Sequence, residues 1–244
     1  MKTSGHTILI TGGTSEIGLA FAEKFLQSGN TVIICGRRKE RLQEIQKKHK
    51  DIVTIESDLS VTTGRQNLAD WVLKNHPQTN ILINNAGIQL VADLTKPVDL
   101  ERIRGEVETN FIAPLHLISL LTSHLKTKEE AAIINISSGL AFTPIAFMPV
   151  YCATKAAIHS LTLSVRHQLK NTSVKVFEIA PPAVDTELGH DRRQDKTQTH
   201  GGIPVSDFIE EAMQAIQHDV LETAVGQAKG LREKRESLFE MLNK

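Results

Sequence analysis

The sequence has little cysteine and no surplus of either charge. Only Cys35 and Cys152 occur among 244 residues, one inside an apolar run and one beside a tyrosine. Neither a disulfide framework nor a zinc site is indicated, which fits a reducing cytoplasm. Lysine plus arginine and aspartate plus glutamate each number 28, so no long-range field gathers nucleic acid. We therefore expect no nucleic-acid partner and a cytoplasmic location.

The sequence also lacks a long hydrophobic run. Its first residues, MKTSGHTILITGG, contain one lysine and an apolar stretch that glycines soon interrupt. This stretch is far too short for a signal peptide or a membrane span. We expect no membrane partner. The length fits one α/β domain with a sizeable core, so residues 1–244 are predicted to form a single domain.

Short runs rich in β-branched residues alternate with longer amphipathic segments. This alternation indicates βαβ units, and unbroken apolar runs are typical of parallel strands buried on both faces. The fold class predicted is α/β: a single-domain, Rossmann-type, doubly wound parallel sheet of about seven strands with helices on both faces. The expected strands are TILIT (7–11), TVIIC (31–35), IVTIE (52–56), ILIN (81–84), AAIINIS (131–137), VKVFEIA (174–180) and a weaker TAVGQ (223–227).

Four segments between or after these strands have a clear helical or polar pattern. Residues 16–29 show apolar side chains at helical spacing, with a glycine as the stop signal. Residues 205–219 predict another helix, and residues 231–244 predict a charged helix that closes the chain. The polar, glycine-ended segment at about 187–205 is predicted to be a variable segment beside the substrate.

The string TGGTSEIG, which begins at Thr11, follows the first expected strand. A strand that runs through Gly12 toward Gly18 and into a helix places backbone amides and a helix amino terminus around a phosphate. A plain tight turn between strand and helix has the same pattern. Glu16 stands where such turns usually have another glycine. Because a carboxylate repels phosphates, we expect Glu16 to turn outward.

The end of the second strand bears on cofactor choice. A dinucleotide fold usually places an acid there for the adenosine ribose, or an arginine where a 2′-phosphate is bound. Here Gly36 is followed by Arg37 and Arg38, with no acid. This favours NADP(H), with NAD(H) as the alternative, although Arg38 also fits the start of a solvated helix. Both arginines are candidate partners for Glu16.

Four motifs in this order carry a family resemblance. They are TGGTSEIG, NNAG from Asn84 to Gly87, SS at Ser137 and Ser138, and YCATK from Tyr151 to Lys155. Over almost its whole length the chain resembles the short-chain dehydrogenase/reductase family. The strings TILITGGTSEIGLAFAEKF, APPAVDTEL and AVGQAKGLR further resemble the DltE branch of bacterial oxidoreductases. The resemblance implies hydride transfer between nicotinamide and a small-molecule carbonyl or secondary alcohol.

The resemblance also implies a cofactor-binding set. Asp58 fits a helix cap as well as an adenine contact, and Pro182 stands where the family usually has glycine before the nicotinamide-binding threonine. The residues implied to bind cofactor are Gly12, Thr14, Ser15, Ile17, Gly18, Arg37, Arg38, Asp58, Leu59, Asn84, Ala86, Gly87, Tyr151, Lys155, Val184 and Thr186.

Tyr151 and Lys155 are the strongest catalytic candidates. Four residues apart on an expected helix, they share one face. A free phenol has a pKa near ~10, and a neighbouring ammonium lowers it toward the range useful for acid–base work. The resemblance implies that Lys155 holds the ribose and that Ser138 orients the substrate. It implies a water-holding role for Asn110, which also fits a mere helix kink.

The substrate walls are less defined. The apolar stretch between Ser138 and Tyr151 borders the substrate in the family, so Leu140 and Phe147 join Ser138 and Tyr151 as predicted substrate contacts. A buried connection or a subunit contact fits this stretch equally well. In the polar segment, basic residues either clamp an anionic group or form a solvated lid; they are Arg192, Arg193 and Lys196.

Three functions are candidates for a chain with these motifs, and the third fits least. The first is an NADP(H)-dependent oxidoreductase with Tyr151 as general acid or base. The alternative is a non-catalytic cofactor-binding redox sensor or partner protein, which would not need Ser138. A nucleotide-sugar epimerase would need a larger carboxyl-terminal domain.

The histidines, His159 among them, lack carboxylate or cysteine partners at metal-ligand spacing, so no metal site is expected. By analogy with the family we expect a homodimer or homotetramer.

Overall fold

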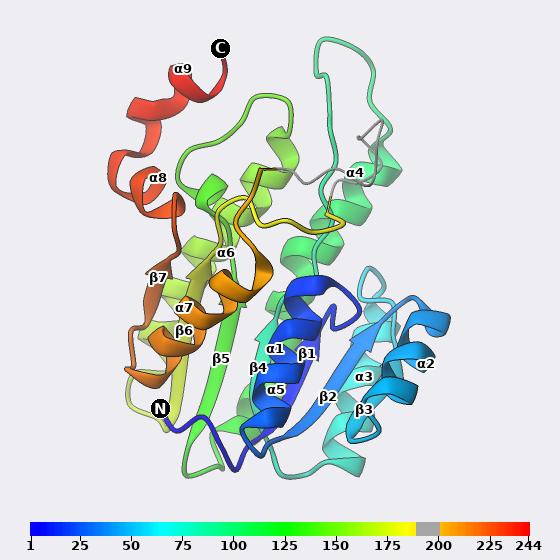
Figure 1. The fold of residues 1–244 in the computed structure, drawn as a ribbon. Helices are drawn as coiled ribbons and strands as arrows, with labels where there is room; N and C mark the ends of the chain where they lie inside the picture. Colours follow the sequence, from blue (N-terminus) through cyan, green and yellow to red (C-terminus); the bar gives the residue numbers. More distant parts are fainter. Residues whose placement is uncertain (189–200) are drawn as a thin grey trace.

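Seven parallel strands form one sheet in the computed structural model, which describes residues 1–188 and 201–244 (Figure 1). The order across the sheet is β3-β2-β1-β4-β5-β6-β7, and every neighbouring pair is parallel. The strands are β1 (Thr7–Thr11), β2 (Thr31–Gly36), β3 (Ile52–Glu56), β4 (Thr79–Asn84), β5 (Ala131–Ile136), β6 (Val174–Ala180) and β7 (Glu222–Ala224).

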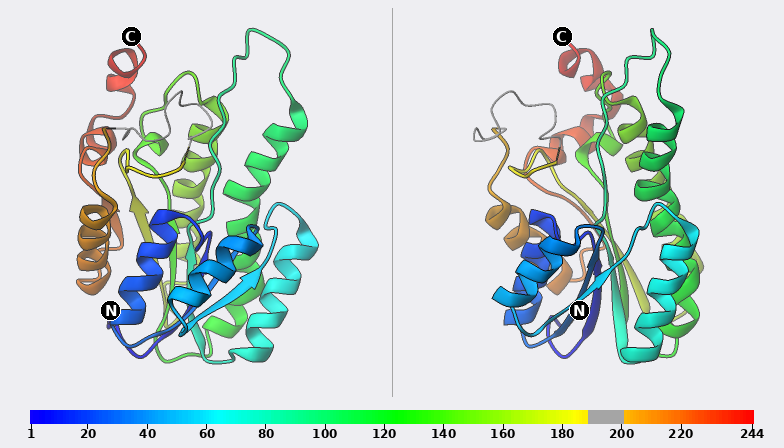
Figure 2. Two further views of the ribbon diagram at one scale, coloured as in Figure 1. Left: turned by 45° about the vertical axis from the view of Figure 1, so that its right-hand side comes forward. Right: turned by 90° about the vertical axis from the view of Figure 1, so that its right-hand side faces the viewer.

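Helices cover both faces of this sheet, as Figure 2 shows in its right-hand view. The predicted single-domain, doubly wound α/β fold is therefore confirmed. The helical segments are α1 (Glu16–Gln27), α2 (Lys39–Lys48), α3 (Thr62–Asn75), α4 (Leu100–Val107), α5 (Ala113–Leu125), α6 (Pro149–Gln168), α7 (Val205–Gln217), α8 (Ala228–Lys234) and α9 (Phe239–Leu242), with a π-helical turn at Glu108–Ile112 and 3₁₀ turns at Gly139–Ala141 and Arg235–Leu238.

Two hydrophobic layers result from the alternation of side chains along the strands. Ile8 and Ile10 of β1 face α1, α2 and α7, whereas Leu9 faces α3, α5 and α6. In the first layer, Phe21 of α1 meets the ring of Phe208 of α7 edge to face, with the ring centroids 6.1 Å apart. Both rings are fully buried. The sheet is thus held between two apolar layers, and its carboxyl-terminal edge is left for chemistry.

The end of the chain differs from the sequence prediction. The single helix expected over residues 231–244 is wrong, because α8 ends at Lys234 and Arg235 takes a left-handed conformation with φ of 48°. A non-glycine residue there cannot continue a right-handed helix. The Thr143 hydroxyl donates to the carbonyl oxygen of Arg235 at 2.9 Å, which stabilises the break from another part of the chain. Strand β7 also begins one residue earlier and is shorter than expected.

None of the helices within the two described ranges combines the length and apolar character needed to cross a membrane.

The packing of the first layer can be tested with two phenylalanines. Phe21 is fully buried and Phe147 is 50% exposed. Phe21→Ala should lower the free energy of unfolding by about 3 to 5 kcal/mol, because it removes a buried ring and leaves a cavity. Phe147→Ala is the matched control and should change it by less than about 1 kcal/mol. Urea unfolding followed by circular dichroism measures both. Equal losses would contradict the assigned core.

Candidate active site

A cleft opens along the carboxyl ends of the strands, where β1 and β4 lie side by side although three helices separate them in sequence. Strand order reverses at this point, and in doubly wound sheets such a switch point is where ligands bind. The cleft has a volume of about 370 Å³. Its lining includes most of the predicted cofactor set: Gly12, Thr14, Ser15, Ile17, Arg37, Arg38, Asp58, Leu59, Ala86, Gly87, Tyr151, Lys155 and Thr186.

Three predicted cofactor residues do not line the cleft but support it from behind. The Asn84 side chain donates to Asn135 of β5 at 2.9 Å, inside the sheet. Gly18 is buried beneath the glycine turn, and Val184 forms a bridge with Ile203. The structure therefore gives these residues positions in the scaffold of the cleft.

Asn85 is a lining residue that sequence reasoning missed, although it is the second asparagine of the NNAG motif. Its side-chain amide donates to the carbonyl oxygens of Thr11 at 2.9 Å and of Gly12 at 3.2 Å. It thereby ties the end of β4 to the glycine turn. Other lining residues outside the predicted set are Glu16, Gly36, Ser57, Ile88, Thr109, Ile136, Ser137, Pro181, Glu187 and Leu188.

The glycine turn needs glycine for steric reasons. Gly12 has a φ of 66°, and a Cβ there would lie 2.7 Å from the Cα of Ala86. A Cβ on Gly18 would overlap the carbonyl oxygen of Gly12 and lie 2.6 Å from the Asn85 amide. Helix α1 begins directly after Ser15, so the free N–H groups of its first turn lie beside the cleft. Such a turn suits an anionic group.

Glu16 has a different partner from the one expected. Its Oε1 accepts a hydrogen bond from the backbone N–H of Glu187 at 3.1 Å. Glu187 in turn pairs with Arg38, with Oε2 2.9 Å from Nη1, and Arg38 also donates to the carbonyl oxygen of Thr14 at 2.7 Å. The expected pairing of Glu16 with Arg37 or Arg38 is therefore wrong. The carboxylate that pairs with Arg38 instead comes from Glu187, in the segment after β6 and 149 residues further along the chain.

Asp58 follows β3 and faces the cleft, but it does not cap α3, whose N-terminal cap is Val61. Its Oδ1 accepts from the Ser60 N–H at 2.9 Å and from the Ser60 hydroxyl at 2.7 Å. Partial burial raises the pKa of Asp58, but the Ser60 bonds and the charge of Arg37 outweigh it and leave that pKa below the ordinary value. The cleft thus has a fixed acceptor at this end.

Tyr151 and Lys155 lie one turn apart on α6 and are both buried, at 6% and 5% exposed. Lys155 Nζ is 5.7 Å from the centre of the Tyr151 ring and donates to the carbonyl oxygen of Ile136 at 2.9 Å. Burial lowers the pKa of Lys155 to about 8, against the opposing charge of Glu178. A phenol and a partly desolvated ammonium therefore meet at the wall of the cleft, an arrangement suited to proton transfer.

Asn110 lies in the π-helical turn between α4 and α5 and is almost fully buried. Its Oδ1 accepts from the Ile88 N–H at 2.8 Å, while its amide donates to the Ile88 carbonyl at 2.8 Å and to Thr154 Oγ1 at 3.2 Å. A Cβ on Gly87 would be 3.5 Å from Asn110 Oδ1 and 3.7 Å from Lys155 Nζ. The helix irregularity and the position near Lys155 therefore occur together, as π turns often do at functional sites.

Of the four predicted substrate contacts, Tyr151 lines the cleft, whereas Ser138, Leu140 and Phe147 do not. Ser138 follows β5 and its Oγ accepts from the Leu140 N–H at 3.1 Å. Leu140 packs on the cluster formed by Met148, Tyr151 and Cys152, and Phe147 is half exposed. The basic residues predicted for the opposite wall, Arg192, Arg193 and Lys196, lie outside the described residues.

His159 corrects another expectation. Its Nδ1 lies 2.8 Å from Oε2 of Glu178 on β6, so this histidine does have a carboxylate partner. The pair forms across the contact between α6 and the sheet, which the spacing of residues along the chain does not show.

The family comparison agrees with this geometry. The model of the short chain dehydrogenase family matches residues 6–197. The uncharacterized oxidoreductase DltE of Bacillus subtilis is 43% identical over 248 residues, which cover 100% of this chain and 98% of that protein. The NADP-dependent 3-hydroxy acid dehydrogenase YdfG of Escherichia coli is 30% identical over 198 residues, covering 78% and 80% of the two chains.

A solved structure shows the same fold. A short-chain dehydrogenase from Sphingobium yanoikuyae in complex with NADPH superposes with a TM-score of 0.82 at 25% identity, covering 90% of this chain and 87% of that one. The fold, the motifs and these matches together place the chain in the short-chain dehydrogenase/reductase family, in the branch that contains DltE. It is an oxidoreductase of the class that uses a nicotinamide cofactor.

The tight packing at Gly18 gives a test of the cleft. Gly18→Ala should weaken nicotinamide cofactor binding by at least about tenfold, because the new Cβ forces the glycine turn away from its position. Gly105→Ala is the control, because a Cβ there meets nothing within 4 Å. Fluorescence titration with NADPH and with NADH measures both variants. Unchanged affinity in folded Gly18→Ala would contradict the role of this turn.

Proposed function

We propose that the protein is an NADP(H)-dependent oxidoreductase that transfers a hydride between nicotinamide and a carbonyl or secondary alcohol substrate, with Tyr151 as general acid or base. The observation that carries this proposal is the buried pair of Tyr151 and Lys155 at the wall of the cleft. Pure cofactor binding has no need of a phenol beside a buried amine. The non-catalytic alternative therefore has less support.

The residues of the cleft fit a dinucleotide. The glycine turn and the first turn of α1 would hold the pyrophosphate, since Gly12 leaves room for close approach. Asp58, Leu59, Ala86 and Gly87 would flank the adenosine. When bound, the nicotinamide supplies or accepts the hydride. Val184 and Thr186, in the segment after β6, would hold the carboxamide.

Two observations favour NADP(H) over NAD(H). No acid follows β2, and both Arg37 and Arg38 line the cleft there. The relative from Escherichia coli is described as NADP-dependent, and the relative from Sphingobium yanoikuyae was solved with NADPH. Against them stands Glu187, whose carboxylate occupies Arg38. Cofactor choice thus depends on whether a 2′-phosphate displaces Glu187.

The chain's own residues would carry the proton. Tyr151 would donate it to the substrate oxygen during reduction and take it back during oxidation. The Lys155 ammonium, present below a pH of about 8, would stabilise the phenolate and hold the ribose. Ser138 would donate to the same substrate oxygen, and Asn110 would hold a water beside Lys155. We also expect these chains to form a homodimer or homotetramer, as the family resemblance implies.

Turnover by a Tyr151→Phe variant tests the proposal. The variant should lose at least about a thousandfold in kcat, because it lacks the phenol proposed to move the proton. Its NADPH affinity should stay within about threefold of the wild type, since the glycine turn is untouched. The measurement is NADPH oxidation with a panel of aldehydes and ketones. If the wild type turns over none of them while still binding NADPH, the enzyme proposal fails and the sensor alternative gains support.

Glu187→Gln tests cofactor choice. The change should strengthen NADPH binding by roughly three- to tenfold and leave NADH binding unchanged, because it frees the guanidinium of Arg38 for a 2′-phosphate. Glu210→Gln, which removes an exposed carboxylate paired with Lys24 outside the cleft, is the control. Equilibrium binding of both cofactors at constant salt is the measurement. An equal gain for NADH would mean that Glu187 acts on something other than the 2′-phosphate site.

A further inference from the structure

Glu178 is a charged residue placed inside the sheet. It lies on β6, opposite Asn135 of β5 and Glu222 of β7, and its side chain is fully buried. Its Oε2 accepts from His159, and its Oε1 has no hydrogen-bond partner among the described residues. Burying a carboxylate costs free energy that one hydrogen bond does not offset. An apolar residue would stabilise this position better, so packing alone does not account for Glu178.

The surroundings of Glu178 connect it to Lys155. His159 lies one helical turn after Lys155 on α6, on the side of that helix that packs against β6. Lys155 Nζ donates to the carbonyl oxygen of Ile136, whose partner on β6 is Ile179, the residue after Glu178. The negative charge of Glu178 raises the pKa of Lys155, which burial lowers to about 8. The charges of Glu178 and Lys155 interact strongly because both side chains are buried in a low-dielectric environment.

We propose that Glu178 is a positioning residue for the reaction: its buried carboxylate, paired with His159, holds Lys155 in the ammonium form that stabilises the Tyr151 phenolate. This inference rests on the proposed function of Tyr151 and Lys155. Neither Glu178 nor His159 lines the cleft, and the proposal gives neither of them a contact with substrate or cofactor. Both act through Lys155.

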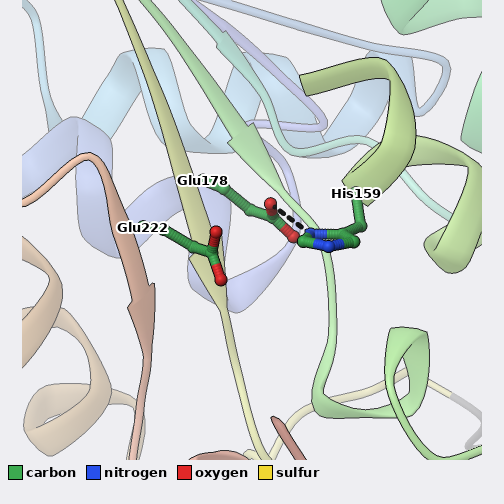
Figure 3. A group of neighbouring side chains, drawn as sticks. All are labelled: His159, Glu178 and Glu222. Atoms are coloured by element: carbon green, nitrogen blue, oxygen red, sulfur yellow. Dashed lines mark hydrogen bonds and ion pairs between the residues drawn. The ribbon is translucent and has the colours of Figure 1, made fainter. Parts of the chain in front are cut away.

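The groups around His159 act in both directions but on balance favour its protonated form. Figure 3 shows its ring beside the Glu178 carboxylate, with Glu222 beyond. The hydrogen bond with Glu178 raises the pKa of His159, burial lowers it, the charge of Glu222 raises it and that of Arg235 lowers it, with a net rise. The Phe142 ring packs edge to face on the imidazole. A protonated His159 and an ionised Glu178 therefore stabilise each other.

A metal ion is the other occupant that these side chains suit. One ligand atom each of His159, Glu178 and Glu222 lies within 4.8 Å of the others. However, the Nε of Arg232 already donates to Oε1 of Glu222. A cation would have to approach this guanidinium, whereas a proton on His159 neutralises Glu178 without doing so. The geometry therefore favours the proton.

Titration of Tyr151 by ultraviolet absorbance tests the proposal. Tyr151 is the only tyrosine in the sequence, so its phenolate absorbance needs no assignment. In the full chain carrying Glu178→Gln, with and without NADP⁺, the midpoint should rise by about one pH unit, because Lys155 then loses its proton earlier. Direct loss of a negative charge near the phenol would move the midpoint down. The sign of the shift thus separates an effect through Lys155 from a simple through-space effect.

Two control variants show whether the shift in the Tyr151 midpoint comes from the charge of Glu178. Glu222→Gln removes a carboxylate from the same group of side chains and should leave the midpoint within about 0.3 pH units, since Glu222 has its own partner in Arg232. Glu178→Asp keeps the charge and should restore most of the wild-type midpoint. If Glu178→Gln does not fold, the double variant His159→Leu, Glu178→Leu replaces the ion pair with apolar side chains and should show the same upward shift.

The proposal fails if folded Glu178→Gln leaves the midpoint unchanged or lowers it, or if Glu222→Gln raises it equally. It also fails if EDTA alone shifts the wild type upward, because a bound cation would then be the charge that matters. None of these titrations needs turnover, so their outcome is independent of the test with Tyr151→Phe. Where a substrate is turned over, Glu178→Gln should lower kcat about tenfold at neutral pH.

Discussion

The contact between the glycine turn and the end of β4 is the constraint on which the cleft depends. Gly12 approaches the backbone of Ala86 so closely that only hydrogen fits between them. The Thr11 hydroxyl donates to Ile83 and accepts from the N–H groups of Asn85 and Ala86, at 3.0 and 3.1 Å. These bonds lock together two strands that lie far apart in sequence. Because β1 and β4 mark the reversal of strand order, the lock also fixes the floor of the cleft.

From that floor, the chemistry depends on how α6 lies against β5 and β6. Lys155 is anchored to the end of β5 and His159 to the middle of β6, so two side chains one turn apart hold the same helix to adjacent strands. Tyr151, one turn earlier on α6, is thereby carried to the wall of the cleft. The same helix thus carries the buried amine of Lys155 and the histidine that pairs with Glu178, whose charge raises the pKa of that amine against the effect of burial.

Much of this was predictable because it rests on local patterns. The strands are mostly apolar runs rich in β-branched residues, and the spacing of Tyr151 and Lys155 requires only a helix to bring them together. The glycine turn was likewise evident, since backbone geometry restricts which residues fit. The predictions that were wrong involved residues whose partners are distant in sequence, or a local change in chain direction. The bond between Glu16 and Glu187 joins residues 171 positions apart, and no spacing rule shows it. The break at Arg235 depends on Thr143, which lies in another part of the fold.

The pairing of His159 with Glu178 shows why residue type alone was insufficient. Along the chain His159 resembles an ordinary helix residue, and Glu178 resembles a polar interruption in a strand that ought to be apolar. The sequence did contain one signal, the free-energy cost of burying the Glu178 carboxylate. A carboxylate in the middle of VKVFEIA needs a partner that offsets this cost. Only the register of β6 against β5 and β7 shows which residues surround it. A charged residue inside a predicted central strand therefore indicates that an ion-pair or hydrogen-bond partner lies nearby in the fold. Here that partner is His159, on the helix that carries Tyr151 and Lys155.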